Sequence, residues 1–290
     1  MHLLLPLVAA LSFALGSMVY KRAFMEGAGL MHAVVVNNVV LALLFGPLLL
    51  LEPRHSVPWD QWYQPFLTAL TFVLGHLLNA TALRVGDVSV ATPLLGAKVI
   101  FVALMGRFLF GHHIHSAQWW STGLATAGVI LMGMTDFRRG GRLGVTTLMA
   151  LGCAGSFAMT DLLIQAWGAS FGVIRFISLQ FVALGLLSLG LVPVFGLSTL
   201  RISTVAWKWM GLGIALSAVQ AWIITGTIAH WKDATGVNVV YATRGIWSLA
   251  LVWWVGRWMG NTERETVGTR RMVLRSLGGI LILSAVALTA

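Results

Sequence analysis

The chain consists of long apolar stretches separated by short polar segments. Ten of these stretches have about the 17–25 residues that a helix needs to cross the hydrocarbon core of a bilayer. Backbone groups in that core must be hydrogen-bonded within the segment, so each stretch is predicted to be a helix. The predicted spans are Leu3–Tyr20, Leu30–Leu51, Phe66–Leu83, Val88–Phe110, Ala117–Thr135, Leu143–Ile164, Phe171–Phe195, Trp207–Ala229, Val237–Met259 and Met272–Ala290.

The two halves of the chain repeat one another. Asp87 precedes the fourth span and Lys98 follows eleven residues later; 146 residues further on, Asp233 and Arg244 stand in the same relation. A second match, Ser12–Phe13–Ala14 with Ser156–Phe157–Ala158, has an offset of 144 residues. Offsets of about half the chain length predict a duplication of one five-span unit.

The seam between the units is predicted in the polar, glycine-rich segment 136–142, which leaves five spans on each side. A unit with an odd number of spans ends on the opposite face of the membrane, so the second copy enters inverted. We therefore predict an all-α polytopic membrane protein of ten transmembrane helices in two inverted five-helix repeats, residues 1–139 and residues 140–290.

Composition agrees with a multi-pass protein of the plasma (inner) membrane. Hydrophobic residues make up 58% and charged residues 10% of the chain, and the mean hydropathy is +0.86. The net charge of +10 could indicate nucleic acid, but the bases lie singly or in small groups between spans, which favours contacts with anionic lipid headgroups. The GxxxG spacing of Gly256 and Gly260 favours packing within the chain, so a monomer or weak homodimer is expected.

Lys98 and Arg244, both near the middle of predicted spans, are the strongest candidates for binding residues. A base at that depth costs about 2.5–3.5 kcal/mol on insertion scales, so it usually faces the protein interior or a water-filled cavity. Arginine offers a planar fork that matches carboxylate or phosphate, and lysine offers a point charge. The alternative is an internal ion pair, for which Asp161 in the sixth span is the obvious partner.

Polar neighbours extend this candidate substrate site. In the ninth span Asn238, Tyr241, Arg244 and Ser248 follow one another at intervals of three or four residues. All four are therefore predicted to share one face of that helix. His76 and Asn79 share a face of the third span. For each of these side chains the alternative is structural hydrogen bonding, because membrane helices associate through the same polar residue types.

Asp87 and Asp233 are predicted to cap the fourth and ninth spans, because each stands directly before an apolar helix. A side-chain oxygen at that position can accept hydrogen bonds from the free N–H groups of the first turn.

Several motifs resemble the EamA-type repeat of the drug/metabolite transporter superfamily. In the first half they are Ala82–Leu83–Arg84–Val85–Gly86–Asp87, Ala91–Thr92–Pro93–Leu94, Gly111 and the run Gly123–Leu124–Ala125–Thr126–Ala127–Gly128–Val129–Ile130–Leu131. The second half closes with Gly278–Gly279–Ile280–Leu281–Ile282–Leu283, which looks like a more diverged form of the same repeat. The resemblance covers essentially the whole chain. One departure is His112, which follows Gly111 where the family usually has an acidic residue.

The resemblance implies ten spans around a central cavity. Gates at the two ends of this cavity close in alternation. In the organic-phosphate translocators of the superfamily a base in the ninth span contacts an anionic group, and Arg244 is the corresponding position. The resemblance also implies cytoplasmic termini. The excess of bases in the odd-numbered connections instead favours external termini under the positive-inside rule.

The sequence predicts transport rather than catalysis. It has no P-loop, no HExxH and no complete GxGD pattern, and the histidines at 112, 113 and 115 favour a solvated loop over a metal site. We expect a secondary active or exchange transporter, without a cofactor, that moves a small polar metabolite, anionic or zwitterionic, by alternating access. The alternatives are a flippase for a phosphate-bearing lipid and a non-transporting integral membrane partner subunit.

Overall fold

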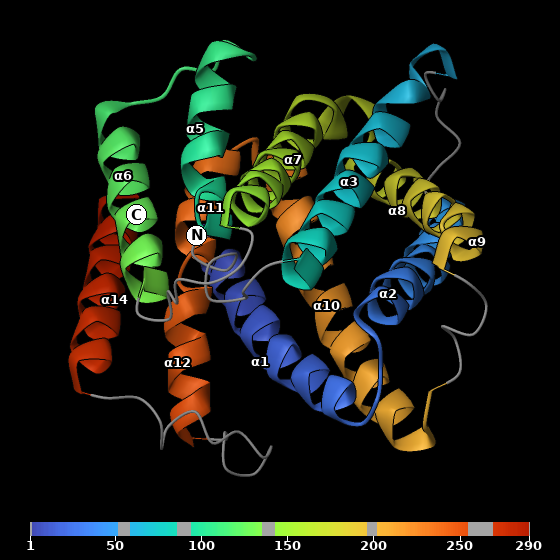
Figure 1. Cartoon of the computed structure of the whole chain (residues 1–290). Coiled ribbons are helices and arrows are strands. Elements are labelled where there is room, and N and C mark those ends of the chain that lie inside the picture. Colours follow the sequence, from blue (N-terminus) through green and yellow to red (C-terminus); the bar gives the residue numbers. More distant parts are fainter. Residues whose placement is uncertain are drawn as a thin grey trace.

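The computed structural model describes residues 2–51, 59–85, 94–134, 143–195, 202–254 and 269–289, and every regular element in these ranges is a helix (Figure 1). The α-helices are α1 Leu5–Met25, α2 Leu30–Phe45, α3 Tyr63–Val85, α5 Lys98–Phe108, α6 Ser116–Met134, α7 Leu143–Phe171, α8 Val173–Gly190, α9 Val192–Phe195, α10 Thr204–Trp231, α11 Ala234–Tyr241, α12 Arg244–Trp254 and α14 Thr269–Thr289. Three short 3-10 helices are η1 His2–Leu4, η2 Gly46–Leu51 and η3 Trp59–Gln61.

Within these ranges, five helices are long and apolar enough to cross a membrane. They are Leu5–Met25, Leu30–Leu51, Gly144–Phe171, Val173–Gly190 and Thr204–Trp231, which match the first, second, sixth, seventh and eighth predicted spans. Helices α3, α6 and α14 coincide with the third, fifth and tenth predicted spans. The prediction of an all-helical membrane protein is confirmed, while the predicted fourth and ninth spans extend beyond the described residues.

The distribution of side chains suits a lipid environment. Leu50, Phe108 and Trp120 are 86%, 76% and 72% exposed, whereas Asn38 and Gln180 are fully buried. In water such an arrangement would be unfavourable, because large apolar side chains gain free energy by leaving water and polar ones lose it. In a bilayer the exposed apolar side chains contact acyl chains, so the interior of the bundle is the only place for polar groups.

Local sequence explains where several helices begin. Ser203 caps α10, because its hydroxyl oxygen accepts a hydrogen bond from the Ala206 N–H at 3.1 Å. The sharp turn between α7 and α8 falls at Gly172, whose φ of 86° is readily available only to glycine. Two long helices therefore meet with a single residue between them.

The helices pack mainly across the two halves of the chain. Helix α1 lies along α10, and α3 lies along α7 in the same way. Helices α6 and α14 form one edge of the bundle, and α2 and α8 lie together toward the opposite edge (Figure 1). Each of these four pairs joins a helix from before residue 136 to one from after residue 142, so the halves are interleaved rather than separate.

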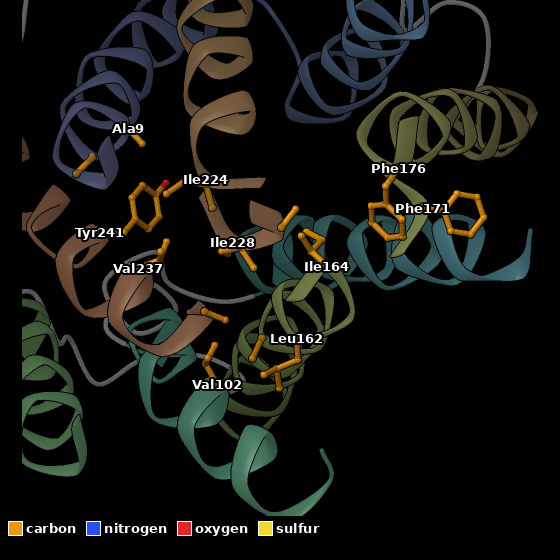
Figure 2. Close-up of a cluster of buried hydrophobic side chains, with 14 residues drawn as sticks. Ala9, Val102, Leu162, Ile164, Phe171, Phe176, Ile224, Ile228, Val237 and Tyr241 are labelled. Carbon is orange, nitrogen blue, oxygen red and sulfur yellow. The ribbon is translucent and has the colours of Figure 1, made fainter. Parts of the chain in front are cut away.

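The largest buried apolar cluster fills the centre of the bundle (Figure 2). It combines Val102 of α5, Leu162 and Ile164 of α7, and Ile228 of α10 with side chains from α1, α8 and α11. Apolar packing here fixes the relative positions of the helices that carry the candidate site residues, because close-packed interiors tolerate little displacement.

Lys98 and Arg244 occupy equivalent positions in two interrupted helices. Residues 94–95 and 240–241 are helical, a two-residue turn follows in both cases, and a new helix then begins at the base. Three backbone hydrogen bonds mark the first break: Ala97 N–H to Leu94 O, Val99 N–H to Gly96 O and Phe101 N–H to Ala97 O. The second break has the same three bonds 146 residues later: Thr243 to Val240, Gly245 to Ala242 and Trp247 to Thr243. The duplication inferred from sequence is thus accompanied by a matched break in the backbone.

Helices α6 and α14 approach closely at a pair of glycines. A Cβ atom on Gly128 would lie 2.6 Å from the carbonyl oxygen of Gly278 and 2.8 Å from Ile282 Cγ1. A Cβ atom on Gly278 would likewise lie 2.6 Å from the Gly128 carbonyl oxygen. Small residues permit such backbone contact where lipid supplies no hydrophobic drive for helix association.

We predict that Gly128→Ala destabilises the protein by about 1–3 kcal/mol, because the new methyl group forces α6 and α14 apart. Gly123→Ala is the matched control, since a Cβ atom at that position of the same helix meets nothing within 4 Å. Thermal unfolding of both purified variants in one detergent measures the difference. Equal melting temperatures would contradict the close packing of these helices.

Candidate functional site

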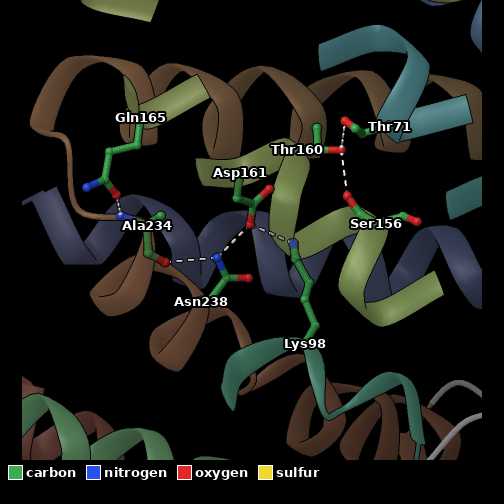
Figure 3. A network of polar contacts seen from close by, with 8 residues as sticks. All are labelled: Thr71, Lys98, Ser156, Thr160, Asp161, Gln165, Ala234 and Asn238. Atoms are coloured by element: carbon green, nitrogen blue, oxygen red, sulfur yellow. Dashed lines mark hydrogen bonds and ion pairs between the residues drawn. The ribbon is translucent and has the colours of Figure 1, made fainter. Parts of the chain in front are cut away.

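One carboxylate, that of Asp161, connects three helices in the interior (Figure 3). The Lys98 ammonium of α5 lies 2.7 Å from Asp161 Oδ2, and the side-chain amide of Asn238 in α11 donates to the same oxygen at 2.6 Å. The side chains of Lys98 and Asp161 are only 13% and 7% exposed. Within the described residues no contact reaches the second oxygen, Oδ1.

Of the two candidate binding bases, Lys98 and Arg244, it is therefore Lys98 that pairs with Asp161. A charge removed from water requires compensation, and the opposite charge with an added hydrogen bond supplies it. The pair joins α5 of the first half to α7 of the second, and Asn238 adds α11.

The start of α11 is held by three further hydrogen bonds. Asp233 Oδ1 accepts from the Gly236 N–H at 2.8 Å, which confirms the predicted cap; Asp87 lies outside the described residues. The Ala234 N–H donates to Gln165 Oε1 at 2.8 Å, and Asn238 Nδ2 also donates to the Ala234 carbonyl oxygen at 2.9 Å. These contacts fix the rotation of α11 and so direct Asn238 at the carboxylate.

Gln165 is itself held by the loop that precedes α6. Its amide nitrogen lies 3.1 Å from His112 Nδ1. Burial lowers the pKa of the His112 imidazole below its usual range, so the ring is neutral at pH 7 and Nδ1 can accept this hydrogen bond. The loop histidine thus orients the residue that anchors α11.

Arg244, the first residue of α12, has a different environment. Its guanidinium carbon lies 5.0 Å from the centroid of the Phe13 ring and 4.7 Å from that of the Tyr241 ring. The guanidinium is also hydrogen-bonded to the Tyr241 hydroxyl, and a fork with five N–H groups retains others for a ligand. Among the described residues no carboxylate forms an ion pair with this half-buried arginine.

The four polar residues of the ninth span lie on two helices, and not on the one continuous helix that was predicted. Asn238 and Tyr241 belong to α11, Arg244 and Ser248 belong to α12, and the turn at 242–243 lies between them. Several hydrogen bonds of this turn span three residues rather than four, as in a 3-10 helix. Asn238 faces Asp161, Tyr241 stacks with Arg244, and Ser248 takes part in neither contact.

The two bases nevertheless belong to one region. The buried thiol of Cys153 in α7 lies within reach of the charges of both Lys98 and Arg244. The phenol of Tyr241 in turn lies within reach of both Arg244 and Asp161. Lys98, Asp161, Asn238, Tyr241 and Arg244 therefore form a single cluster, which we call the charged cluster.

His76 and Asn79 lie on α3, away from the direct contacts of the charged cluster. His76 Nδ1 is 3.3 Å from Asn38 Nδ2, which also donates to Ser188 Oγ at 3.0 Å. Asn79 adjoins the cluster through its backbone, to which the Cys153 thiol is hydrogen-bonded, and its buried side-chain oxygen has no hydrogen-bond partner in the described part.

Sequence reasoning missed two aromatic residues of the site, Phe13 and Phe157. Phe13 covers the Arg244 guanidinium, and the Phe157 ring lies 5.5 Å from that of His76. Both belong to the repeated Ser–Phe–Ala triplet, which was used only as a sign of duplication. The repeat itself was the available signal, since it marks equivalent places in the two halves.

We predict that Lys98→Met destabilises the protein by about 3–5 kcal/mol, because it leaves the Asp161 carboxylate buried and uncompensated. Adding Asp161→Leu removes that charge and should restore most of the loss. Arg22→Met is the control, because the Arg22–Glu26 pair is 33% and 29% exposed and should contribute less than about 1 kcal/mol. Melting temperatures test this, and a Lys98→Met protein as stable as the control would refute it.

Comparison with known proteins agrees with these observations. Residues 1–134 match the family model of the EamA-like transporter family. Two relatives from Pseudomonas fluorescens are each named "Probable 4-amino-4-deoxy-L-arabinose-phosphoundecaprenol flippase subunit ArnE". The relative from strain Pf-5 is 31% identical over 67 residues, which are 23% of this chain and 59% of that protein. The relative from strain Pf0-1 is 32% identical over 81 residues, 27% of this chain and 71% of that protein.

The fold is also similar to that of a protein of known crystal structure. The TM-score is 0.71 at 17% sequence identity, over 99% of this chain and 95% of the other. At this identity the similarity extends to the fold alone. The matched family model, the relatives and the apolar helices identify the chain as a membrane protein that belongs to the EamA-like transporter family.

Proposed function

We propose that the protein is a secondary active or exchange transporter that moves a small polar metabolite, anionic or zwitterionic, and binds the anionic group at Arg244. One observation carries the proposal. The charged cluster holds two bases and one acid, and the acid is taken by Lys98. One positive charge, on Arg244, remains inside the bundle without a carboxylate in the described part of the chain.

An uncompensated charge in an apolar interior favours an anionic ligand. Coulombic attraction is several times stronger at the effective dielectric of a protein than in water. Arg244 is also the first residue of α12, where the helix dipole contributes further positive potential. A carboxylate or phosphate between the N–H groups of the fork would relieve both effects, and the Phe13 and Tyr241 rings hold the fork in place.

Alternating access would follow from ten spans in two inverted repeats, residues 1–139 and 140–290. The matched breaks before Lys98 and Arg244 and the pairing of α1 with α10 and of α3 with α7 support this arrangement. Discontinuous helices at the repeat interface are typical of the binding sites of secondary transporters. The family match over residues 1–134 also ends close to the proposed seam.

The remaining predicted residues would take supporting roles in the inner membrane of the cell. Lys98, Asp161 and Asn238 would border the bound solute beside Arg244 and Tyr241, with Ser248, His76 and Asn79 farther along the same interior. The energy would come from a solute gradient, exchange or a proton gradient, because the sequence has no P-loop.

A flippase for a phosphate-bearing lipid is the second candidate, and the printed name of the two relatives favours it. The same free guanidinium would then bind a lipid phosphate. Those relatives are named as flippase subunits, so a partner subunit that transports nothing by itself is a third outcome. Liposomes with purified protein distinguish the three: uptake of a water-soluble phosphate ester, translocation of a labelled phospholipid, or neither.

We predict that Arg244→Ala lowers affinity for an anionic ligand by about 10- to 150-fold, which corresponds to loss of one charge-assisted contact of about 1.5–3 kcal/mol. Arg244→Lys should also weaken binding, because a point charge replaces the planar fork. Calorimetry with ethyl phosphate measures the affinity, and the melting temperature verifies the fold.

Arg22→Ala is the matched control, because it removes an arginine far along α1 from Phe13 and outside the charged cluster. It should leave the affinity unchanged. Wild-type affinity in a well-folded Arg244→Ala protein would refute the assignment of the anion site.

A further inference from the structure

We propose that the charged cluster selects a zwitterionic ligand, in which a protonated amine on Asp161 accompanies the anionic group on Arg244. This inference rests on the proposed function, since it presupposes the anion site. It adds a second, oppositely charged contact and so narrows the ligand to molecules that carry both groups.

The free oxygen of Asp161 carries the inference. The ammonium of Lys98 and the amide of Asn238 both bind Oδ2, at 2.7 and 2.6 Å, and leave Oδ1 without a partner in the described structure (Figure 3). A carboxylate accepts several hydrogen bonds, and one oxygen here retains its full capacity.

The surroundings restrict what can bind that oxygen. The cluster is nearly closed to solvent, with Asp161 7% and Lys98 13% exposed, so a charged donor gains more there than a neutral one. A second anion would be repelled by the carboxylate. A primary amine with a positive charge matches both the sign and the hydrogen-bonding direction of Oδ1.

The distance between the two contacts suits a small molecule. Asn238 touches Asp161, Tyr241 touches Arg244, and both lie on the eight-residue helix α11. The Tyr241 phenol lies within reach of the charges of both Asp161 and Arg244, so a single side chain separates the two groups. An amine and a phosphate a few bonds apart can therefore reach both groups at once.

The test compares ligands that differ only in the amine. The water-soluble pair is phosphoethanolamine and N-acetylphosphoethanolamine, and the lipid pair is dihexanoyl phosphatidylethanolamine and its N-acetyl derivative. Binding of each to the whole chain in an uncharged detergent is measured by calorimetry. We expect the free amine to bind about 10- to 150-fold more tightly within at least one pair. The pair that binds more tightly shows whether the headgroup comes from a free solute or from a lipid.

Two variants assign the preference to its residue. Asp161→Asn should lower the ratio of the two affinities to about one, because it weakens binding only of the compound with the free amine. Arg244→Gln should weaken binding of both members of a pair. If Asp161→Asn fails to fold, the double variant Lys98→Gln/Asp161→Asn, which removes both charges of the pair, takes its place.

The outcomes separate the inference from the proposed function. Equal binding of the two members by the wild-type protein would overturn the amine contact and leave the anion site intact. An unchanged preference in the Asp161 variant would overturn it as well. Failure of the wild-type protein to bind any of the four compounds would overturn both.

Discussion

The structure depends on how three charges are compensated in an apolar interior. Two bases, Lys98 and Arg244, are placed inside a bundle whose outer surface is covered by exposed leucine, phenylalanine and tryptophan side chains. A single carboxylate, Asp161, serves one of them. The other lies against the Phe13 and Tyr241 rings and is hydrogen-bonded to the Tyr241 hydroxyl, neutral contacts that stabilise a cation less than an ion pair does. The proposed anion site rests on this imbalance of charge.

The two halves of the chain are alike in their backbone and unlike in their charges. The backbone breaks in the same way before Lys98 and Arg244, and α1 with α10 repeats the packing of α3 with α7. The acid was not duplicated: the residue 144 positions before Asp161 is Ser17, whose hydroxyl donates to the Phe13 carbonyl oxygen at 2.8 Å. The acid of the second half therefore neutralises the base of the first half, while the first half has a serine, and no acid, at the position equivalent to Asp161.

Hydropathy was sufficient to predict the helices, because only helices satisfy the backbone in a stretch of about 20 apolar residues. The cap at Asp233 was also predictable, since capping depends on a side chain and the turn that follows it. The break at residues 242–243 was not, because an apolar run carries no sign of where its hydrogen bonds shorten. Which base pairs with Asp161 depends on the packing of α5, α7 and α11, and spacing along the chain could not decide it.

The central claim is that Arg244 is the open anion-binding cation and that Lys98 is occupied by Asp161. Crystals of the whole chain soaked with tungstate, a heavy analogue of phosphate, would test it by anomalous X-ray diffraction. The account predicts an anomalous peak within hydrogen-bonding distance of the Arg244 guanidinium, with the Lys98–Asp161 pair intact beside it. A well-ordered Arg244 without a peak, or one already paired with a carboxylate, would contradict the account.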